Sequence, residues 1–146
     1  MNASLKQVGP SEGYLPPIDP LTQPWWDATR ERRLLLQQCT ACGSVQHYPR
    51  HLCLNCGSVE HLGWVESTGR GIIDTFTVVH RSPRPDLDVP YVVARIRLAE
   101  GVIVLSNVVG VRPDDVESGA LVELGWRDLT DGRALPVFTI ESEDAA

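Results

Sequence analysis

The four cysteines of this chain form two C-x-x-C-G segments, residues 39–43 and 53–57, with ten residues between Cys42 and Cys53. A C-x-x-C pair points both thiolates into one space, and the glycine that follows lets backbone amides turn toward the sulfurs. Two such pairs complete a tetrahedral site of four sulfurs, the arrangement that suits structural zinc. The predicted metal ligands are Cys39, Cys42, Cys53 and Cys56.

Two other uses of these thiols stay open beside zinc. Iron fits the same cage, because four-sulfur tetrahedra accept either metal. Two disulfides would require an oxidising compartment, yet residues 1–13 contain no apolar run of signal-peptide length. Since no stretch is long enough to span a membrane either, we expect a cytoplasmic protein with no membrane partner.

Binding of all four thiols to one metal would leave no cysteine free to act as a nucleophile. His47, His51 and His61 flank the cysteines, but tetrahedral zinc with four sulfur ligands has no open coordination position for catalysis. The sequence also lacks a G-x-S-x-G elbow, a P-loop and a dinucleotide fingerprint. We therefore predict no catalytic residue here, and a self-contained hydrolase or electron-transfer protein is the least favoured hypothesis.

Charge is distributed unevenly along the 146 residues, whose formal net charge is −6. Residues 30–84 carry seven basic and four acidic side chains, so this middle segment has a net charge of +3. Residues 85–146 carry five basic and twelve acidic side chains. A basic patch on an acidic protein favours a small anionic ligand over a long polyanion.

The elements that must position the cysteines begin after a proline-rich N-terminal arm, residues 1–23. Residues 24–31 favour a short helix, with Pro24 in its first turn. Trp25 and Trp26 are adjacent, so we expect that they cannot both face one small core. One is expected to pack inward and the other to stay exposed for a binding contact. Packing of both onto the core is the alternative.

Apolar segments on either side of the two cysteine pairs predict a zinc ribbon, so that helix and ribbon together occupy residues 24–67. Five segments rich in Val and Ile follow, separated by turn sequences, which predicts a five-stranded OB-fold barrel over residues 68–141. The fold class is therefore mainly β, and residues 142–146 form an acidic tail. The expected barrel strands are 71–80, 91–98, 102–109, 121–126 and 136–140.

A zinc ribbon joined to an OB-fold also suggests a protein that binds single-stranded nucleic acid, through a basic groove and stacking aromatic residues. The expected strands contain only four aromatic residues, and the second half of the barrel is acidic. Because an acidic surface repels phosphate backbones, nucleic-acid binding is kept as the alternative hypothesis.

Beyond the cysteines, an ordered set of segments carries a family resemblance. The segments are the Trp-containing helix and residues 34–43, 48–50, 53–57, 69–71, 90–94, 98–101 and 135–138. This set resembles the acyl-CoA-associated zinc-ribbon/OB-fold family, long catalogued as a domain of unknown function. The resemblance covers nearly the whole folded chain, and its specificity comes from the ordered set rather than from the cysteine pairs alone.

The resemblance implies a rubredoxin-like zinc ribbon followed by an OB-fold, with the four cysteines binding the metal. It also implies a non-catalytic partner of thiolase-superfamily enzymes: thiolases, hydroxymethylglutaryl-CoA synthase assemblies and thiolase-like aldolases of steroid side-chain or aromatic degradation. In such complexes the family member bridges subunits and helps to hold the CoA part of the substrate. No fused hydratase domain is visible in this chain, so a free-standing family member is expected.

Several charged and aromatic residues agree with that implication. CoA carries a 3′-phosphate and a pyrophosphate, which arginines bind through charge-assisted hydrogen bonds. A tryptophan suits the adenine or a partner surface. The leading hypothesis is an accessory subunit in a hetero-oligomer with a thiolase or thiolase-like aldolase that acts on acyl-CoA. We predict CoA contacts at Arg50, Arg70, Arg81 and Arg84, and a partner interface at Trp25 and Trp26.

Overall fold

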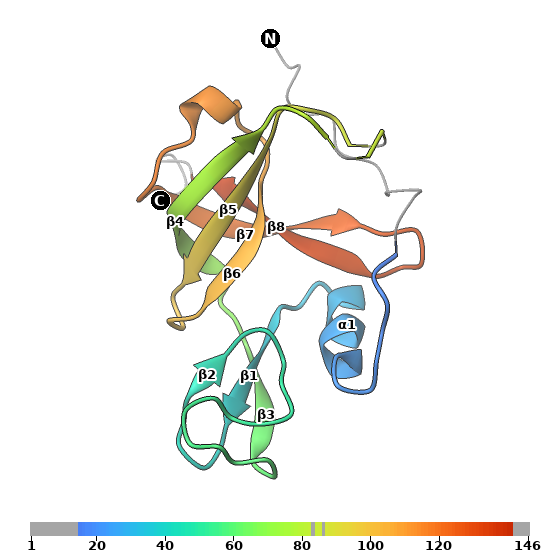
Figure 1. Cartoon of the computed structure of the whole chain (residues 1–146), viewed down its shortest axis with the longest axis vertical. Helices are drawn as coiled ribbons and strands as arrows, with labels where there is room; N and C mark the ends of the chain where they lie inside the picture. The colour runs from blue at the N-terminus through green and yellow to red at the C-terminus, as the bar shows by residue number, and fades with distance from the viewer. Residues whose placement is uncertain (1–14, 83, 86, 142–146) are drawn as a thin grey trace.

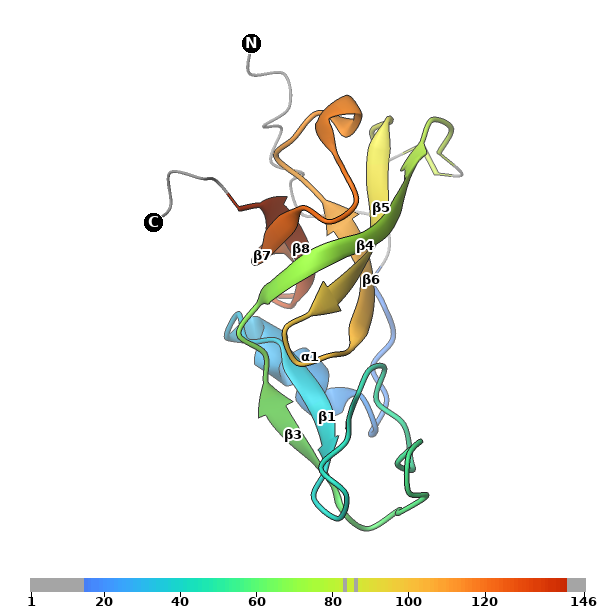
Figure 2. The same ribbon diagram turned by 90° about the vertical axis from the view of Figure 1, so that its left-hand side faces the viewer.

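The computed structural model describes residues 15–82, 84–85 and 87–141, and this part of the chain is mostly strand (Figure 1). A small three-stranded ribbon comes first and a closed five-stranded barrel second (Figure 2). The predicted fold class, a short helix and zinc ribbon before an OB-fold barrel, is confirmed. The elements are α1 (Gln23–Arg30), β1 (Leu35–Cys39), β2 (Val45–Gln46), β3 (Leu62–Glu66), β4 (Arg70–Val79), β5 (Tyr91–Leu98), β6 (Ile103–Val108), η1 (Pro113–Asp115), β7 (Leu121–Asp128) and β8 (Ala134–Ile140).

In the ribbon, β1 lies between β2 and β3 and pairs antiparallel with both. The β1–β3 ladder runs from Leu35 opposite Glu66 to Cys39 opposite Leu62. Leu36 is fully buried in the core. Since its longest strands have five residues, this sheet is too small to be stable without further support.

The barrel strands are joined in the order β4-β5-β6-β8-β7, and β4 pairs with β7 to close the barrel. Along β5, buried residues alternate with more accessible ones, so Val92, Ala94 and Ile96 point into the barrel. β6 and β8 pair in parallel where Val108 lies opposite Phe138. Phe138 is the largest fully buried side chain among the described residues, which places the centre of the core inside the barrel.

Three residues join the ribbon to the barrel. Gly69 has a φ of +80°, and a Cβ there would lie 2.7 Å from Cβ of Leu124, so conformation and packing both require glycine. The Glu100 carboxylate accepts hydrogen bonds from the Ser67 hydroxyl at 2.7 Å and from the Thr68 backbone amide at 3.0 Å. The junction is therefore packed and hydrogen-bonded to the β5–β6 turn.

Helix α1 contacts both β1 of the ribbon and β8 of the barrel. Trp25 and Trp26 are 9% and 8% exposed, and their rings meet edge to face with centroids 4.7 Å apart. The expectation that one of them stays exposed is wrong, because ribbon and barrel offer the helix two apolar surfaces rather than one. The alternative, in which both tryptophans pack on the core, is the one observed.

Arg133, between β7 and β8, is buried, with 2% of its surface exposed. Its guanidinium group donates hydrogen bonds to the Asp131 carboxylate at 2.6 Å and to the Pro16 carbonyl at 2.8 Å. The same group lies 4.5 Å from the centre of the Trp26 ring, a cation–π contact. One side chain thus connects the segment before α1, the helix itself and the β7–β8 hairpin.

The five expected barrel strands are all present, and β7 and β8 each extend two residues beyond their predicted limits. Most of the predicted arm and all of the predicted acidic tail fall on residues 1–14 and 142–146, outside the described residues. The division at residues 23/24, 67/68 and 141/142 stays a prediction. No helix in the described ranges is long and apolar enough to cross a membrane.

Candidate metal centre and an adjoining groove

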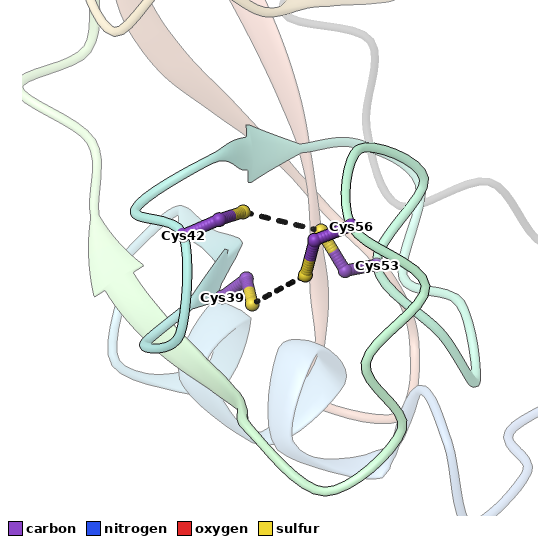
Figure 3. A group of neighbouring side chains, drawn as sticks. All are labelled: Cys39, Cys42, Cys53 and Cys56. Atoms are coloured by element: carbon purple, nitrogen blue, oxygen red, sulfur yellow. Dashed lines mark hydrogen bonds between the residues drawn. The ribbon is translucent and has the colours of Figure 1, made fainter.

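The two cysteine pairs lie in turns that share one hydrogen-bond pattern, and they face each other across a small space (Figure 3). In the first turn, the Gly43 amide donates to the Cys39 carbonyl at 2.8 Å, and the Cys39 amide donates to the Ser44 carbonyl at 2.9 Å. The residues around Cys53 make the same two contacts, both at 2.9 Å. Each turn contains a glycine with positive φ, a conformation that glycine adopts without strain.

The sulfur atoms are spaced as a tetrahedral metal site requires. Sγ of Cys39 lies 3.7 Å from Sγ of Cys56, and Sγ of Cys42 lies 3.6 Å from Sγ of Cys53. All four sulfurs lie within 4.8 Å of one another. Zinc–sulfur bonds of about 2.3 Å in a tetrahedron place the sulfurs about 3.8 Å apart. The four residues fit structural zinc, as the sequence predicts.

The protonation of the thiols shows what the ion contributes. A hydrogen bond from the Asn55 side chain lowers the pKa of Cys42 to about 6. For Cys56, a backbone hydrogen bond from Ser58 lowers the pKa, but burial and hydrogen bonds with the other thiols outweigh it and raise the pKa to about 11. Thiols this close cannot all ionise at neutral pH on their own. A bound cation allows all four to be thiolates, and it leaves no thiol free for catalysis.

Two buried glutamines order the chain between the cysteine pairs. Gln37 on β1 donates to the Arg50 carbonyl and accepts from the Arg50 amide, both at 2.8 Å. Gln46 on β2 donates to Gln37 at 2.6 Å. It also donates to the Leu52 carbonyl at 3.0 Å and accepts from the Leu54 amide at 2.9 Å. Sequence reasoning missed this network, whose only signal is one glutamine on each of two paired strands.

An apolar hollow of about 310 Å³ lies where α1, the ribbon and the barrel meet. Two residues that line it, Trp25 and His47, each have a buried ring nitrogen with no hydrogen-bond partner among the described residues, Nε1 and Nδ1 respectively. The two ring centroids are 6.2 Å apart. The wall also includes Trp26, Leu105, Leu135 and Pro136.

Burial lowers the pKa of His47 from 6.5 to about 4. Between these pH values the unfolded chain binds a proton at this residue and the folded chain does not. The stability that the neutral ring contributes is therefore fully present above pH 6.5 and is lost as the pH falls toward 4, by about 3 kcal/mol in all.

We expect His47→Phe to make the protein less sensitive to acid. Between pH 7.5 and pH 5.0, the wild type should lose about 2 kcal/mol of unfolding free energy more than the variant, since only the wild type gains a proton here on unfolding. Urea unfolding at the two pH values measures the difference. His51→Phe, at an exposed position, is the control and should behave as the wild type. Equal acid sensitivity of wild type and His47→Phe would contradict the prediction.

A second hollow, of about 370 Å³, adjoins the first on the outer face of β5 and β6. Arg127 of β7 lines it, is half-buried, and makes no hydrogen bond or ion pair with any described residue. Burial lowers the pKa of its guanidinium group. Tyr91 and Asn107 line the hollow beside it, with Asp88 exposed at the rim. Sequence reasoning missed Arg127, which stands in the acidic half of the chain.

The structure does not bring the four predicted CoA-binding arginines together. Arg70 begins β4, with its guanidinium 3.5 Å from the Glu141 carboxylate. Arg81 and Arg84 follow the other end of this ten-residue strand, about 30 Å away along it. Arg50 lies in the ribbon, after the segment that lines the apolar hollow. Arg81 and Arg84 are the pair that shares one loop.

Two family models match consecutive parts of the chain. Residues 26–60 match the rubredoxin-like zinc ribbon domain of ChsH2, and residues 64–127 match the C-terminal OB-fold domain of ChsH2. The chain is also 32% identical over 104 residues to a DUF35 domain-containing scaffold protein of Methanocaldococcus jannaschii. That match covers 70% of this chain and 74% of the scaffold protein.

A longer relative is the probable enoyl-CoA hydratase alpha subunit of Thermomonospora curvata, 40% identical over 119 residues. The match covers 78% of this chain but 35% of the relative, so the chain spans about a third of that protein's length. A solved structure, the Ltp2-ChsH2(DUF35) aldolase, contains a chain with 37% sequence identity and a TM-score of 0.80. This alignment covers 86% of the present chain and 98% of that chain.

Proposed function

This chain belongs to the DUF35 family, in which a ChsH2-type zinc ribbon precedes an OB-fold, and we propose that it is an accessory subunit of a thiolase or thiolase-like aldolase. In this proposal the chain binds structural zinc, bridges subunits and helps to hold the CoA part of an acyl-CoA thioester. The catalytic partner supplies the residues that make or break the carbon–carbon bond.

The observation that carries the proposal is the likeness to a chain of the Ltp2-ChsH2(DUF35) aldolase. Because the alignment covers 98% of that chain, the likeness includes the ribbon and the barrel together rather than one common module. The name of the hydratase relative, a probable enoyl-CoA hydratase alpha subunit, adds the link to CoA thioesters. A closed four-sulfur centre also agrees with a subunit that leaves catalysis to its partner.

We place the partner contact on the ribbon. Four large apolar side chains of the ribbon are exposed in this chain. Apolar side chains at the centre of a protein interface are normally covered by the partner, so these four are the proposed contact. Trp25 and Trp26 lie in the helix that packs against this ribbon, so their proposed part is to support the interface rather than to form its outer surface. The exposed ribbon side chains are Tyr48, Leu52, Leu54 and Val59.

For the CoA contact, the loop after β4 is the best placed of the predicted positions. Arg81 is exposed, and the same loop supplies Leu87 and Asp88 to the second hollow. Arg50 follows Pro49, which lines the apolar hollow, and stays a proposed contact. Arg70 lies at the opposite end of β4, so its proposed contact requires a ligand that reaches the ribbon–barrel junction.

Co-expression with a thiolase-superfamily protein encoded beside this chain should yield a stable hetero-oligomer, and acyl-CoA turnover should require both chains. Leu54→Asp places a charge on the exposed ribbon surface and should weaken the complex at least about tenfold. Leu121→Asp, on a comparably exposed leucine of β7, is the matched control. Size-exclusion chromatography with light scattering and an acyl-CoA assay measure both. A chain that purifies alone and leaves the partner's activity unchanged would contradict the proposal.

Binding of single-stranded nucleic acid is the second candidate, because the outer face of β5 and β6 is the face on which OB-folds bind oligonucleotides. Among the residues that the structure describes, the hollow on this face is lined by one half-buried cation, Arg127, and one aromatic ring, Tyr91. A steep loss of oligonucleotide affinity with increasing salt, in a chain that has no protein partner, would favour this candidate.

A further inference from the structure

β3 lies at a margin of the ribbon sheet (Figure 2). The sheet has the order β2-β1-β3, so β3 pairs with β1 on one side and with no described strand on the other. β2, at the opposite margin, has two residues. β3 therefore presents an open edge along its whole length of five residues.

Two hydrogen bonds fix which groups of β3 point toward that edge. The Thr40 amide donates to the His61 carbonyl at 2.7 Å just before the strand, and the Ser67 amide donates to the Leu34 carbonyl at 2.8 Å just after it. Bonded pairs alternate along an antiparallel ladder, so every second residue of β3 bonds β1 and the others direct their N–H and C=O groups to the open edge. The residues that bond β1 are Gly63 and Val65, and those that face the open edge are Leu62, Trp64 and Glu66.

The open edge has neither a bonding partner nor a protective feature. Among the described residues, no group bonds the N–H or C=O groups of Leu62, Trp64 and Glu66. Exposed edges in natural proteins are usually blocked by proline, lysine, a bulge or a very short strand. β3 has no proline or lysine, and its register with β1 is regular along all five residues. Such an edge is a template for an added strand.

The charges around the edge indicate the chemistry of that strand. Glu60 and Glu66, at the two ends of β3, are exposed. Nε of Arg33 lies 3.3 Å from the Glu66 carboxylate, but Nη1 of the same side chain lies 3.2 Å from the Glu31 carboxylate. The cluster beside Glu66 therefore keeps a net negative charge. An added strand with basic residues at its ends and an apolar residue opposite the half-buried Trp64 complements this edge.

A second copy of this chain fits the edge less well. One antiparallel register pairs all three edge residues with those of a second copy. It sets Trp64 opposite Trp64, and Glu66 opposite Leu62 at both ends. A carboxylate then faces an apolar side chain twice, and no basic residue reaches the acidic ends of the strand. A strand from a different protein is therefore favoured.

We infer that β3 binds an extended segment of the catalytic partner, which joins the ribbon as a fourth strand and carries basic residues at its ends. The inference rests on the proposed function and deepens it, because it names the strand and the backbone groups that hold the partner. The edge continues the contact proposed for the exposed ribbon side chains, since Val59 lies three residues before β3. In such pairing, main-chain hydrogen bonds give affinity and alternate side chains give specificity.

Amide hydrogen exchange, resolved to single residues, tests the inference on the zinc-loaded chain alone and in complex with the co-expressed thiolase-superfamily protein. In the chain alone, the amides of Gly63 and Val65 should exchange slowly, because they are bonded to β1. The amides of Leu62, Trp64 and Glu66 should exchange rapidly. In the complex these three should slow at least about tenfold. A complex in which they still exchange rapidly overturns the inference and leaves the proposed function standing, whereas both fail if no complex forms.

Protection of the three edge amides in the chain alone would also overturn the inference. Protection that rises with chain concentration would identify a second copy as the occupant of the edge. Protection that does not depend on concentration would identify another segment of the same chain.

Leu62→Pro removes one N–H donor from the edge and leaves the β1 ladder intact, because proline is tolerated at the first residue of a strand. Leu62→Ala is the matched control, since it shortens the same side chain but keeps the donor. In isothermal titration with the separately purified partner, Leu62→Pro should bind about fivefold more weakly than Leu62→Ala. Equal affinities of the two variants, both with bound zinc and a slowly exchanging Val65 amide, would contradict the inference.

Glu66→Lys tests the charge of the added strand. It should weaken binding of the partner about fivefold, because it opposes the basic end of the segment. Glu123→Lys makes the same change at an exposed position of β7 and should leave the affinity unchanged. Tighter binding by Glu66→Lys would overturn the basic character assigned to the segment.

Discussion

Removal of the metal at neutral pH is expected to unfold the ribbon while the barrel stays folded. The ribbon sheet has strands of five residues at most, so the ion must supply much of its folding energy. Structural zinc contributes about 10–16 kcal/mol in small domains of this kind. Cys53→Ser replaces one fully buried ligand and should have the same effect. The barrel ladders do not pass through the cysteines, so they should persist.

Amide hydrogen exchange separates the two halves of the molecule. The Cys39 and Gly43 amides, which are bonded within the first turn, should lose protection on chelation, whereas amides of β5 and β6 should keep it. Elemental analysis should give one zinc ion per chain. Asn55→Ala removes the amide 3.5 Å from the Cys42 sulfur but no ligand, so it should keep both the ion and the ribbon. A metal-free chain with a protected ribbon would refute the prediction, and iron in the site would correct the identity of the ion.

We also expect Arg133→Met to lower the unfolding free energy of the protein substantially. The substitution keeps most of the side-chain volume, but it leaves the Asp131 carboxylate and the Pro16 carbonyl without the donor that now reaches them at 2.6 and 2.8 Å. A hydrogen bond to or from a charged group contributes about 1.5–3 kcal/mol, and the Arg133 guanidinium donates two of them. Because the Asp131 side chain is 29% exposed, water replaces part of this loss, and we expect a total of about 3 kcal/mol. A loss of about 3 kcal/mol corresponds to a fall of about 10 °C in Tm for a chain of this length.

Differential scanning calorimetry of the zinc-loaded protein measures this change. The matched control is Arg95→Met, because Arg95 is 53% exposed and lies 3.6 Å from Asp74. An exposed ion pair of that kind contributes little, so the control should stay within about 0.5 kcal/mol of the wild type. Equal Tm values for the two variants would mean that Arg133 does not hold α1 against the β7–β8 hairpin. A selective loss of protection in α1 would support that role.

The metal centre and the barrel were predictable because their signals are local. Each cysteine pair carries both of its ligands and its glycine within five residues, and the turn hydrogen bonds follow from that spacing. The barrel strands were predictable for the same reason, because their sequence signals are also local. In β5 the apolar residues that face inward alternate with residues such as Arg95 and Arg97 that face outward, and turn sequences mark the strand ends.

The adjoining groove was not predictable, because it depends on contacts between distant segments. Trp25 and His47 come together only when α1 packs beside the ribbon. Arg127 reaches the face of β5 and β6 only through the order of the barrel strands. The spacing of the four arginines predicted to contact CoA was not predictable for the same reason. Arg70 and Arg81 are close in sequence, but a ten-residue extended strand separates them in space. A count of charged residues along a segment gives no information about that distance.

The three-residue junction between ribbon and barrel has a consequence for assembly. Glu100 holds it by hydrogen bonds to Ser67 and Thr68, and Gly69 is locked against Leu124. Two modules on a loose tether would each lose orientational freedom when a partner binds both, and that loss would weaken the complex. In this chain the orientation of the ribbon relative to the barrel is already fixed when the protein folds. A partner bound to the ribbon is therefore held at a fixed distance and orientation from a partner or ligand bound on the barrel face.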